Sequence, residues 1–263
     1  MNSTAEHPSE KPTGATPADT SARQFWDRAM GAIARYHQCD VIGAENVPKT
    51  GGVVVVGPHS LATYDLFVLC HASLKILGRQ TYIVGDDLMF KIPMLGKALA
   101  EIGFIRGGRD YAIERLRQGD LLGIAPGGMA EALHQSEGKR LDWSRRKGFS
   151  WVAMKAGVPV VPTACPNADD IYTVYGNPVT DWIYKRFKLP LPVFRGVGPT
   201  PWPRKVKLVH LIGKPVFPEA PPERFTDDDV ERFHQRIVDA TQALVDEGRR
   251  IGANPGPDVD RLY

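Results

Sequence analysis

The sequence has few cysteines and no long apolar segment. Its three cysteines, Cys39, Cys70 and Cys165, are too scattered among 263 residues to form a disulfide framework, and no CxxC pair indicates a zinc site. No segment reaches the roughly 18–20 consecutive apolar residues that a membrane-spanning helix needs. We therefore expect a cytoplasmic protein without a bound metal, which lies on a membrane surface and does not cross it.

The sequence also lacks a strong excess of either charge. Its 33 Lys and Arg residues barely exceed its 30 Asp and Glu residues, which is too small a difference to indicate nucleic acid as a partner. The cations gather, however, in residues 179–214, where eight Lys or Arg residues stand against one Asp. Aromatic residues lie among them, namely Trp182, Tyr184, Phe187, Phe194 and Trp202. Cations mixed with aromatic side chains suit the headgroup layer of an anionic membrane surface.

Short apolar runs alternate with helical segments along most of the chain. VVVV at 53–56 is the clearest run, because consecutive β-branched residues are typical of a strand that is buried on both faces. Similar strands are expected at 81–84, 103–105, 121–125, 158–163 and 205–213. The alternation predicts an α/β fold, with one domain over 23–250 and a largely parallel central sheet flanked by helices. Residues 1–22 are expected to form a disordered leader and residues 251–263 a C-terminal tail.

The first junction between a strand and a helix contains a histidine and an aspartate. GPHS follows the strand and places His59 in a turn, while Asp65 stands six positions later, in the next helix. Six residues turn an ideal helix by about 600°, so the two side chains meet only if His59 stays in the turn. An imidazole can accept a proton at neutral pH, and a carboxylate beside it fixes its tautomer. The alternative is that His59 caps the helix and Asp65 is unrelated to it.

Two later junctions carry residues that are suited to binding a ligand. GFIRGGRD places Arg106 and Arg109 around two glycines, an arrangement that can hold phosphate or carboxylate. In APGGMAEA, Gly127 and Gly128 expose backbone N–H groups to a ligand oxygen, and Glu131 can bind a hydroxyl or cap the following helix. Taken singly, the first block is explained equally well as a surface turn, and the second better as an ordinary type II turn.

Together and in this order, these blocks resemble the glycerolipid acyltransferase superfamily over about residues 40–217. The superfamily pattern is a His and an Asp separated by four residues, followed by G-F-I-x-R, P-E-G-T-R and V-P-V-V-P blocks. This sequence has five residues between His59 and Asp65, and PGGMAE replaces P-E-G-T-R. With the RKGF block that contains Arg146, both departures resemble the monoacylglycerol/diacylglycerol acyltransferase-like branch.

The resemblance implies an enzyme that moves a fatty acyl group from acyl-CoA or an acyl carrier protein to a hydroxyl of a glycerolipid or another lipid alcohol. It implies that His59 is the general base, with Asp65 as its partner, and that no cofactor takes part beyond the thioester donor. The residues expected beside the substrates are Arg106, Arg109, Gly127, Gly128 and Glu131. The missing arginine of P-E-G-T-R favours a neutral alcohol, although Arg106 keeps a lysophospholipid or glycerol phosphate acceptor open.

Other classes of function remain as alternatives. A lipid-binding protein with a decayed site would not need His59 and Asp65, so their presence argues against it. A metal-dependent hydrolase would use both as ligands, but no second histidine stands at a ligand spacing. The chain has no G-x-S-x-G sequence, which argues against a serine hydrolase. Cys165 follows a buried strand and is expected in the core, where it would not act as a nucleophile.

Overall fold

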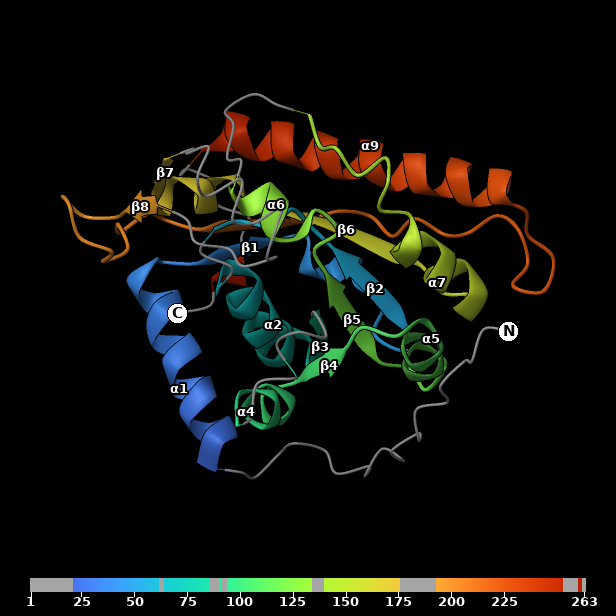
Figure 1. The fold of residues 1–263 in the computed structure, drawn as a ribbon, viewed down its shortest axis with the longest axis horizontal. Coiled ribbons are helices and arrows are strands. Elements are labelled where there is room, and N and C mark those ends of the chain that lie inside the picture. The colour runs from blue at the N-terminus through green and yellow to red at the C-terminus, as the bar shows by residue number, and fades with distance from the viewer. Residues whose placement is uncertain are drawn as a thin grey trace, which may run out of the picture.

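The fold alternates strands and helices around one central sheet. The computed structural model describes residues 21–61, 64–85, 90, 94–133, 140–175, 193–252 and 260–261. Figure 1 shows helices on both faces of the sheet, with α9 along the top of the molecule and α1 at its lower left. This arrangement confirms the expected α/β fold with a central sheet flanked by helices.

The described strands form an eight-stranded sheet in the order β10-β1-β9-β6-β2-β5-β3-β4. Their bounds are β1 (Asp40–Ile42), β2 (Val53–Val56), β3 (Thr81–Gly85), β4 (Phe104–Arg106), β5 (Leu121–Ile124), β6 (Val160–Ala164), β9 (Val209–Ile212) and β10 (Asp260–Arg261). Neighbours pair in parallel except β6 with β9 and β1 with β10. Strands β7 (Thr173–Tyr175) and β8 (Val193–Arg195) form a separate antiparallel pair. The central sheet is therefore largely parallel, as expected.

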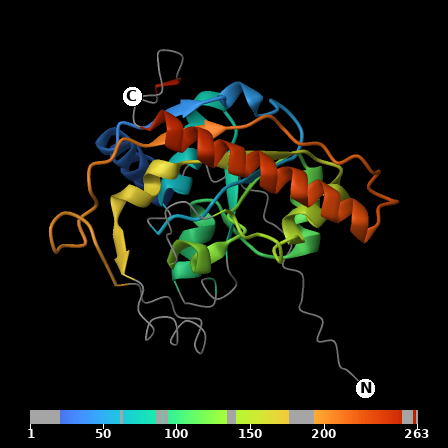
Figure 2. The same cartoon turned by 90° about the horizontal axis from the view of Figure 1, so that it is seen from above.

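Helices cover both faces of this sheet. On one face, α5 (Arg109–Arg117), α7 (Gly148–Ala156) and α9 (Asp227–Ile251) share an apolar cluster with the strands. The opposite face carries α1 (Ser21–Tyr36), α2 (Tyr64–Leu77) and α4 (Leu95–Glu101). Figure 2 shows α9 lying across the sheet. Shorter helices are η1 (Ala44–Asn46), α6 (Gly128–Leu133) and η2 (Pro166–Ile171).

The four valines of β2 are buried because the sheet is covered on both sides. Val54 and Val56 point into the cluster with α5, α7 and α9, whereas Val53 and Val55 point to the side of α2. Alternate residues of a strand face opposite sides, so a strand in the middle of such a sheet has no polar face. Each buried valine contributes about 1.5–3 kcal/mol relative to an exposed one. The same burial fixes the strand that carries His59 at its end.

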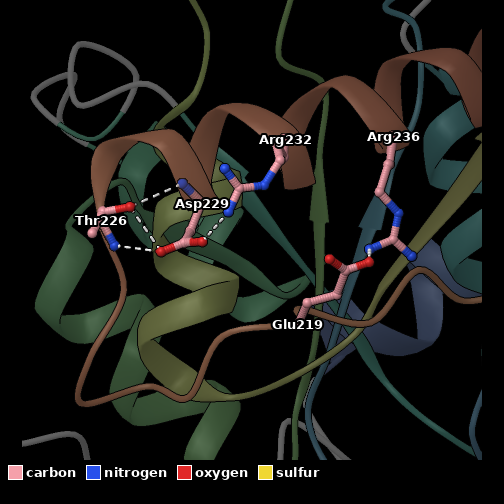
Figure 3. A network of polar contacts seen from close by, with 5 residues as sticks. All are labelled: Glu219, Thr226, Asp229, Arg232 and Arg236. Carbon is pink, nitrogen blue, oxygen red and sulfur yellow. Dashed lines mark hydrogen bonds and ion pairs between the residues drawn. The ribbon is translucent and has the colours of Figure 1, made fainter.

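Helix α9 is held at its N-terminus by side chains that replace the missing helical hydrogen bonds. The Asp229 backbone N–H donates to the Thr226 hydroxyl, and the Thr226 backbone N–H donates to the Asp229 carboxylate at 2.8 Å, as Figure 3 shows. Asp229 also pairs with Arg232, and Glu219 pairs with Arg236 at 2.6 Å. Hydrogen bonds to the carboxylate lower the pKa of Asp229, chiefly through the Thr226 backbone. This capping box defines where the helix begins.

The structure differs from the expectations at both ends of the chain. Helix α1 begins at Ser21, two residues inside the expected leader, and residues 1–20 lie outside the described residues. In the expected C-terminal tail, Asp260 and Arg261 pair with β1. The strand predicted at 205–213 is shorter, because the described β9 covers only Val209–Ile212. Within the described part of the chain, no helix is long and apolar enough to cross a membrane.

Candidate active site

A cavity of about 680 Å³ opens where three neighbouring strands end. Strands β2, β5 and β6 are parallel, so their carboxyl ends meet at one edge of the sheet. The lining side chains come from the segments that follow these strands, from 140–146 and from the last turns of α9. The polar, glycine and cysteine residues among them are His59, Ser60, Asp65, Gly127, Glu131, Arg140, Asp142, Arg145, Arg146, Cys165, Asp169 and Arg249. Ligands bind at this edge of the sheet in α/β proteins generally.

His59 stays in the turn before α2, as the sequence required for a site at this position. Its ring Nδ1 lies 2.8 Å from the backbone carbonyl oxygen of Ser60. A carbonyl oxygen only accepts hydrogen bonds, so Nδ1 carries the hydrogen when the ring is neutral. The other nitrogen, Nε2, then has its lone pair available for a proton. This local contact selects the tautomer that a general base needs.

Asp65 is buried in the first turn of α2 and lines the same cavity. Its Oδ1 accepts a hydrogen bond of 2.5 Å from the Ser60 hydroxyl. Among the contacts of the described residues, the carboxylate therefore binds Ser60, whose carbonyl in turn contacts the ring of His59. Burial raises the pKa of Asp65, while the Ser60 hydroxyl and the nearby His59 oppose the rise. His59 and Asp65 thus lie in one site and are linked through Ser60.

Glu131 ties the turn of His59 to the segment that follows α6. One carboxylate oxygen, Oε2, accepts the backbone N–H of His59 at 2.8 Å, and the other, Oε1, accepts the indole N–H of Trp143 at 3.1 Å. Burial raises the pKa of Glu131, and these two donors oppose the rise. A Cβ at Gly127 would lie 2.2 Å from Oε2 and 2.6 Å from the Glu131 Cβ. The absence of a side chain at Gly127 therefore leaves room for this carboxylate.

The sequence of the chain is similar to those of known proteins. A model of the acyltransferase family matches residues 38–166. A human protein named "DGAT1/2-independent enzyme synthesizing storage lipids" is 31% identical over 231 residues, which cover 88% of this chain and 67% of that protein. The chain belongs to the acyltransferase family. Membership of the glycerolipid acyltransferase superfamily, expected from its motifs, is thereby confirmed.

Two more relatives extend the comparison for this acyltransferase family member. The bovine protein with the same name as the human one is 32% identical over 231 residues, which cover 88% of this chain. The chain spans only 65% of the length of that bovine relative. A protein named "Diacylglycerol O-acyltransferase 2" from Dictyostelium discoideum is 25% identical over 237 residues, which cover 81% of this chain and 71% of that protein.

Three of the predicted binding residues do not line the cavity. Among the described lining residues, Arg106, Arg109 and Gly128 do not occur. The Arg106 guanidinium lies over the ring of Phe90 at 5.7 Å, and that of Arg109 lies over Trp151 at 5.2 Å. The Gly128 backbone N–H donates to the Ala125 carbonyl at 3.1 Å, which closes the turn after β5. The roles of these residues toward a substrate remain predictions.

The cavity is also lined by residues that were not predicted from the sequence to belong to the site. Burial raises the pKa of Asp169 to about 7, and the nearby Asp65 adds to the rise. Arg140 and Arg145 come from the segment between α6 and α7, and Arg249 from the end of α9. The arginines around the RKGF block are the sequence signal that could have pointed to Arg140 and Arg145. Arg249 stands 190 positions after His59 in the sequence, so only the fold reveals its place.

The cysteine of the cavity does not provide a ready nucleophile. Cys165 is partly exposed, and burial raises the pKa of its thiol well above the ordinary range. The reactive form of cysteine is the thiolate, which a raised pKa disfavours. Among the described residues, no group of three or more His, Cys, Asp or Glu side chains is arranged to hold a metal ion. The role of His59 as a general base remains a prediction.

Proposed function

We propose that this chain transfers a fatty acyl group from acyl-CoA or an acyl carrier protein to a hydroxyl of a glycerolipid or another lipid alcohol. The observation that carries the proposal is one cavity lined by the buried Asp65 and by His59, whose Nδ1 contacts the Ser60 carbonyl oxygen. The names of the relatives point in the same direction, since they refer to storage lipids and to diacylglycerol. Storage-lipid synthesis requires acylation of a neutral hydroxyl, which fits the loss of the P-E-G-T-R arginine.

The proposed reaction begins with removal of the hydroxyl proton by Nε2 of His59. The alkoxide-like oxygen attacks the carbonyl carbon of the thioester, and the resulting tetrahedral intermediate releases the thiol as the proton passes to the leaving sulfur. The Ser60 carbonyl oxygen orients the His59 ring, and the Ser60 hydroxyl donates a hydrogen bond to the Asp65 carboxylate. The negative charge of Asp65 also stabilises the imidazolium that forms. No covalent intermediate on the protein is required.

The developing oxyanion needs a hydrogen-bond donor close to the reacting carbonyl. The backbone N–H of Gly128 already donates to Ala125, so we assign no oxyanion contact to it. Gly127 lines the cavity directly and has no side chain to block an approaching oxygen. We therefore place the oxyanion beside the Gly127 backbone, where a single preorganised N–H contributes several kcal/mol, about 2.7–4, to the transition state.

Membrane contact is proposed at the β7–β8 hairpin. Four apolar side chains of this hairpin and the loop after it are 45–65% exposed, namely Tyr175, Val193, Val197 and Trp202. Arg195 and Lys205 are exposed among them, which suits an anionic lipid surface. Phe194 instead packs on Tyr172, with ring centroids 5.0 Å apart. The predicted aromatics Trp182, Tyr184 and Phe187 lie outside the described residues.

In the sequence, the hairpin directly follows a segment that lines the cavity. Helix η2, which supplies Pro166 and Asp169 to the cavity lining, runs directly into β7. Figure 2 shows β7 and the loop after β8 at the edge of the molecule, away from the middle of α9. If the hairpin binds a membrane, the membrane surface would therefore lie near the cavity that a lipid acceptor must enter to reach His59.

A panel of acceptors tests the proposed activity. The purified chain is incubated with oleoyl-CoA and, separately, with diacylglycerol, monoacylglycerol, a long-chain alcohol, lysophosphatidic acid or glycerol 3-phosphate. We expect release of free CoA thiol, together with an acylated product, that depends on a neutral lipid acceptor. Release with only a phosphorylated acceptor would favour the alternative lysophospholipid or glycerol-phosphate acyltransferase. No acceptor-dependent release would contradict the proposal and favour a lipid-binding protein.

Vesicle co-sedimentation tests the proposed membrane surface. We expect the chain to bind vesicles that contain anionic phosphatidylserine more strongly than vesicles of phosphatidylcholine alone, and Trp202→Ala to weaken this binding severalfold. Phe217→Ala is the matched control, because Phe217 is also more than half exposed but lies outside the hairpin. Equal loss of binding in the two variants would contradict the assignment of the hairpin.

A further inference from the structure

Four arginines line the cavity. Arg140, Arg145 and Arg146 come from the segment between α6 and α7, and Arg249 comes from the last turn of α9. All four side chains are exposed, and none makes a hydrogen bond or ion pair with another described residue. We use the name arginine wall for these four residues. Their guanidinium groups therefore provide hydrogen-bond donors for an acceptor on a ligand in the cavity.

Hydrogen bonds hold the backbone of the segment that carries three of these arginines. The Leu141 backbone N–H donates to the Gln242 side chain of α9 at 2.9 Å. The buried His234 of α9 lies 3.0 Å from the Trp143 carbonyl oxygen through its Nε2. Trp143 itself is 1% exposed and donates its indole N–H to Glu131. The segment is therefore fixed between α9 and the site, which places its arginines on the cavity.

Among the described residues, the carboxyl groups of the cavity form no ion pair with this wall. Asp65 and Glu131 accept hydrogen bonds from Ser60, His59 and Trp143, and burial raises the pKa of both carboxyls. Burial likewise raises the pKa of Asp169 to about 7, and the positive charge of Arg249 nearby opposes the rise. Asp142 is exposed and accepts a hydrogen bond from Ser144. The four guanidinium groups, by contrast, keep their charge at any physiological pH.

We propose that the arginine wall binds a phosphate group of a substrate. Guanidinium binds phosphate through paired, charge-assisted hydrogen bonds, and several such groups suit an anion of high charge. The inference rests on the proposed function for the identity of the cavity as a substrate site. Two sources have this chemistry: the phosphates of the thioester donor's carrier, and the headgroup of a phosphorylated acceptor. The cations that the P-E-G-T-R block would have supplied are thus provided by a different segment and by α9.

Direct binding separates this inference from the catalytic proposal. Coenzyme A and glycerol 3-phosphate are titrated calorimetrically into the chain and into Arg145→Ala/Arg146→Ala and Arg249→Ala variants. Loss of two charge-assisted contacts is expected to weaken binding about tenfold or more in the double variant. Arg224→Ala is the control, because Arg224 is exposed and precedes α9, away from the cavity lining. Unchanged melting temperatures show that the exposed substitutions leave the fold intact.

The outcomes identify the source of the phosphate. Weaker binding of coenzyme A alone assigns the wall to the donor, and the Michaelis constant should then rise for oleoyl-CoA but not for oleoyl-pantetheine, which lacks phosphate. Weaker binding of glycerol 3-phosphate alone assigns it to a phosphorylated acceptor. Equal affinities of all variants for both probes would overturn the inference. Arginine-dependent binding without any acyl transfer would overturn the proposed function and leave the phosphate site standing.

Discussion

The two walls of the cavity differ in how their side chains are held. On the wall of His59, Asp65 and Glu131, the polar groups are buried or half-buried, and each makes a specific hydrogen bond. The side chains of the arginine wall are exposed and make no hydrogen bond or ion pair with another described residue, although the backbone of the segment that carries three of them is fixed. Chemistry requires groups held in one geometry, whereas recognition of a mobile anion tolerates flexible donors. Substitutions on the first wall should therefore lower kcat, and those on the second should raise KM.

The largest loss is expected from His59→Ala. Removal of a general base costs about 10²- to 10⁴-fold in rate, so kcat for acyl transfer should fall by that factor. Binding of coenzyme A should persist, because His59 belongs to the other wall. Single-turnover thiol release together with calorimetry measures both quantities. Near-normal transfer by this variant would show that His59 is not the base.

A smaller loss is expected from Asp65→Asn. Because the carboxylate acts on His59 through Ser60, kcat should fall about 10- to 100-fold, as for supporting residues that orient a functional group. A direct partner of the imidazole would cost more, near 10⁴-fold. Asp142→Asn is the matched control, since Asp142 lines the cavity but is exposed. A loss for Asp65→Asn as large as that for His59→Ala would contradict the indirect link.

The same Asp65→Asn variant should be more stable than the original chain. Burial raises the pKa of Asp65 in the folded state, so the folded protein holds a proton that the unfolded chain has released once the pH exceeds about 4. This difference destabilises the fold increasingly as the pH rises toward the raised pKa. Asparagine avoids the cost, so the gain in Tm should be larger at pH 7 than at pH 4, with about 2–4 °C for each kcal/mol. Thermal melts over this range check the sign.

Glu131→Gln should lower kcat about tenfold. One side-chain oxygen of glutamine can still accept a hydrogen bond, but its NH₂ group then faces either the His59 N–H or the Trp143 indole N–H. A buried donor left without an acceptor costs about 1–3 kcal/mol, and the turn of His59 should shift. Glu223→Gln at an exposed position is the control. An effect confined to KM would indicate that Glu131 contacts the substrate directly, as the sequence alone predicted.

The two glycines after β5 should differ in their response to alanine. A Cβ at Gly127 meets the Glu131 side chain, so Gly127→Ala should reproduce the loss of kcat seen in Glu131→Gln. At Gly128 nothing lies within 4 Å of an added Cβ, but φ is +58°. Gly128→Ala should therefore cost only the left-handed strain, about 1–2 kcal/mol of stability. Equal losses of kcat in both variants would contradict this distinction.

The sequence predicted the strand and turn that carry His59 but not the contacts of the site. The four consecutive valines predict β2 because an uninterrupted apolar run is typical of a strand buried on both faces. GPHS then places His59 in the turn. The spacing to Asp65 showed only that the two do not share a helical face. That Ser60 lies between them follows from the start of α2 at Tyr64, which places Asp65 one residue inside the helix.

Contacts between distant segments could not be read from the sequence. Glu131 follows His59 by 72 positions, and its role depends on the parallel pairing of β2 with β5, which brings the two turns together. Arg106 and Arg109 looked like ligand-binding residues because of their type and neighbours. In the fold, Arg106 ends β4 at the edge of the sheet and Arg109 begins α5, whereas the cavity opens at β2, β5 and β6. Strand order decides which junctions meet, and local patterns do not contain it.

The length of α9 sets the position of Arg249. The helix is anchored at Thr226 by its capping box and in its first half by the ion pair of Arg236, and it reaches the cavity some 23 residues later, roughly 35 Å along its axis. Insertion of one residue after Ile237 would rotate Arg249 by about 100° and advance it by about 1.5 Å. The charge of the cavity would then change without any substitution in it. Relatives that differ only by an insertion in this helix would thus be expected to prefer different substrates.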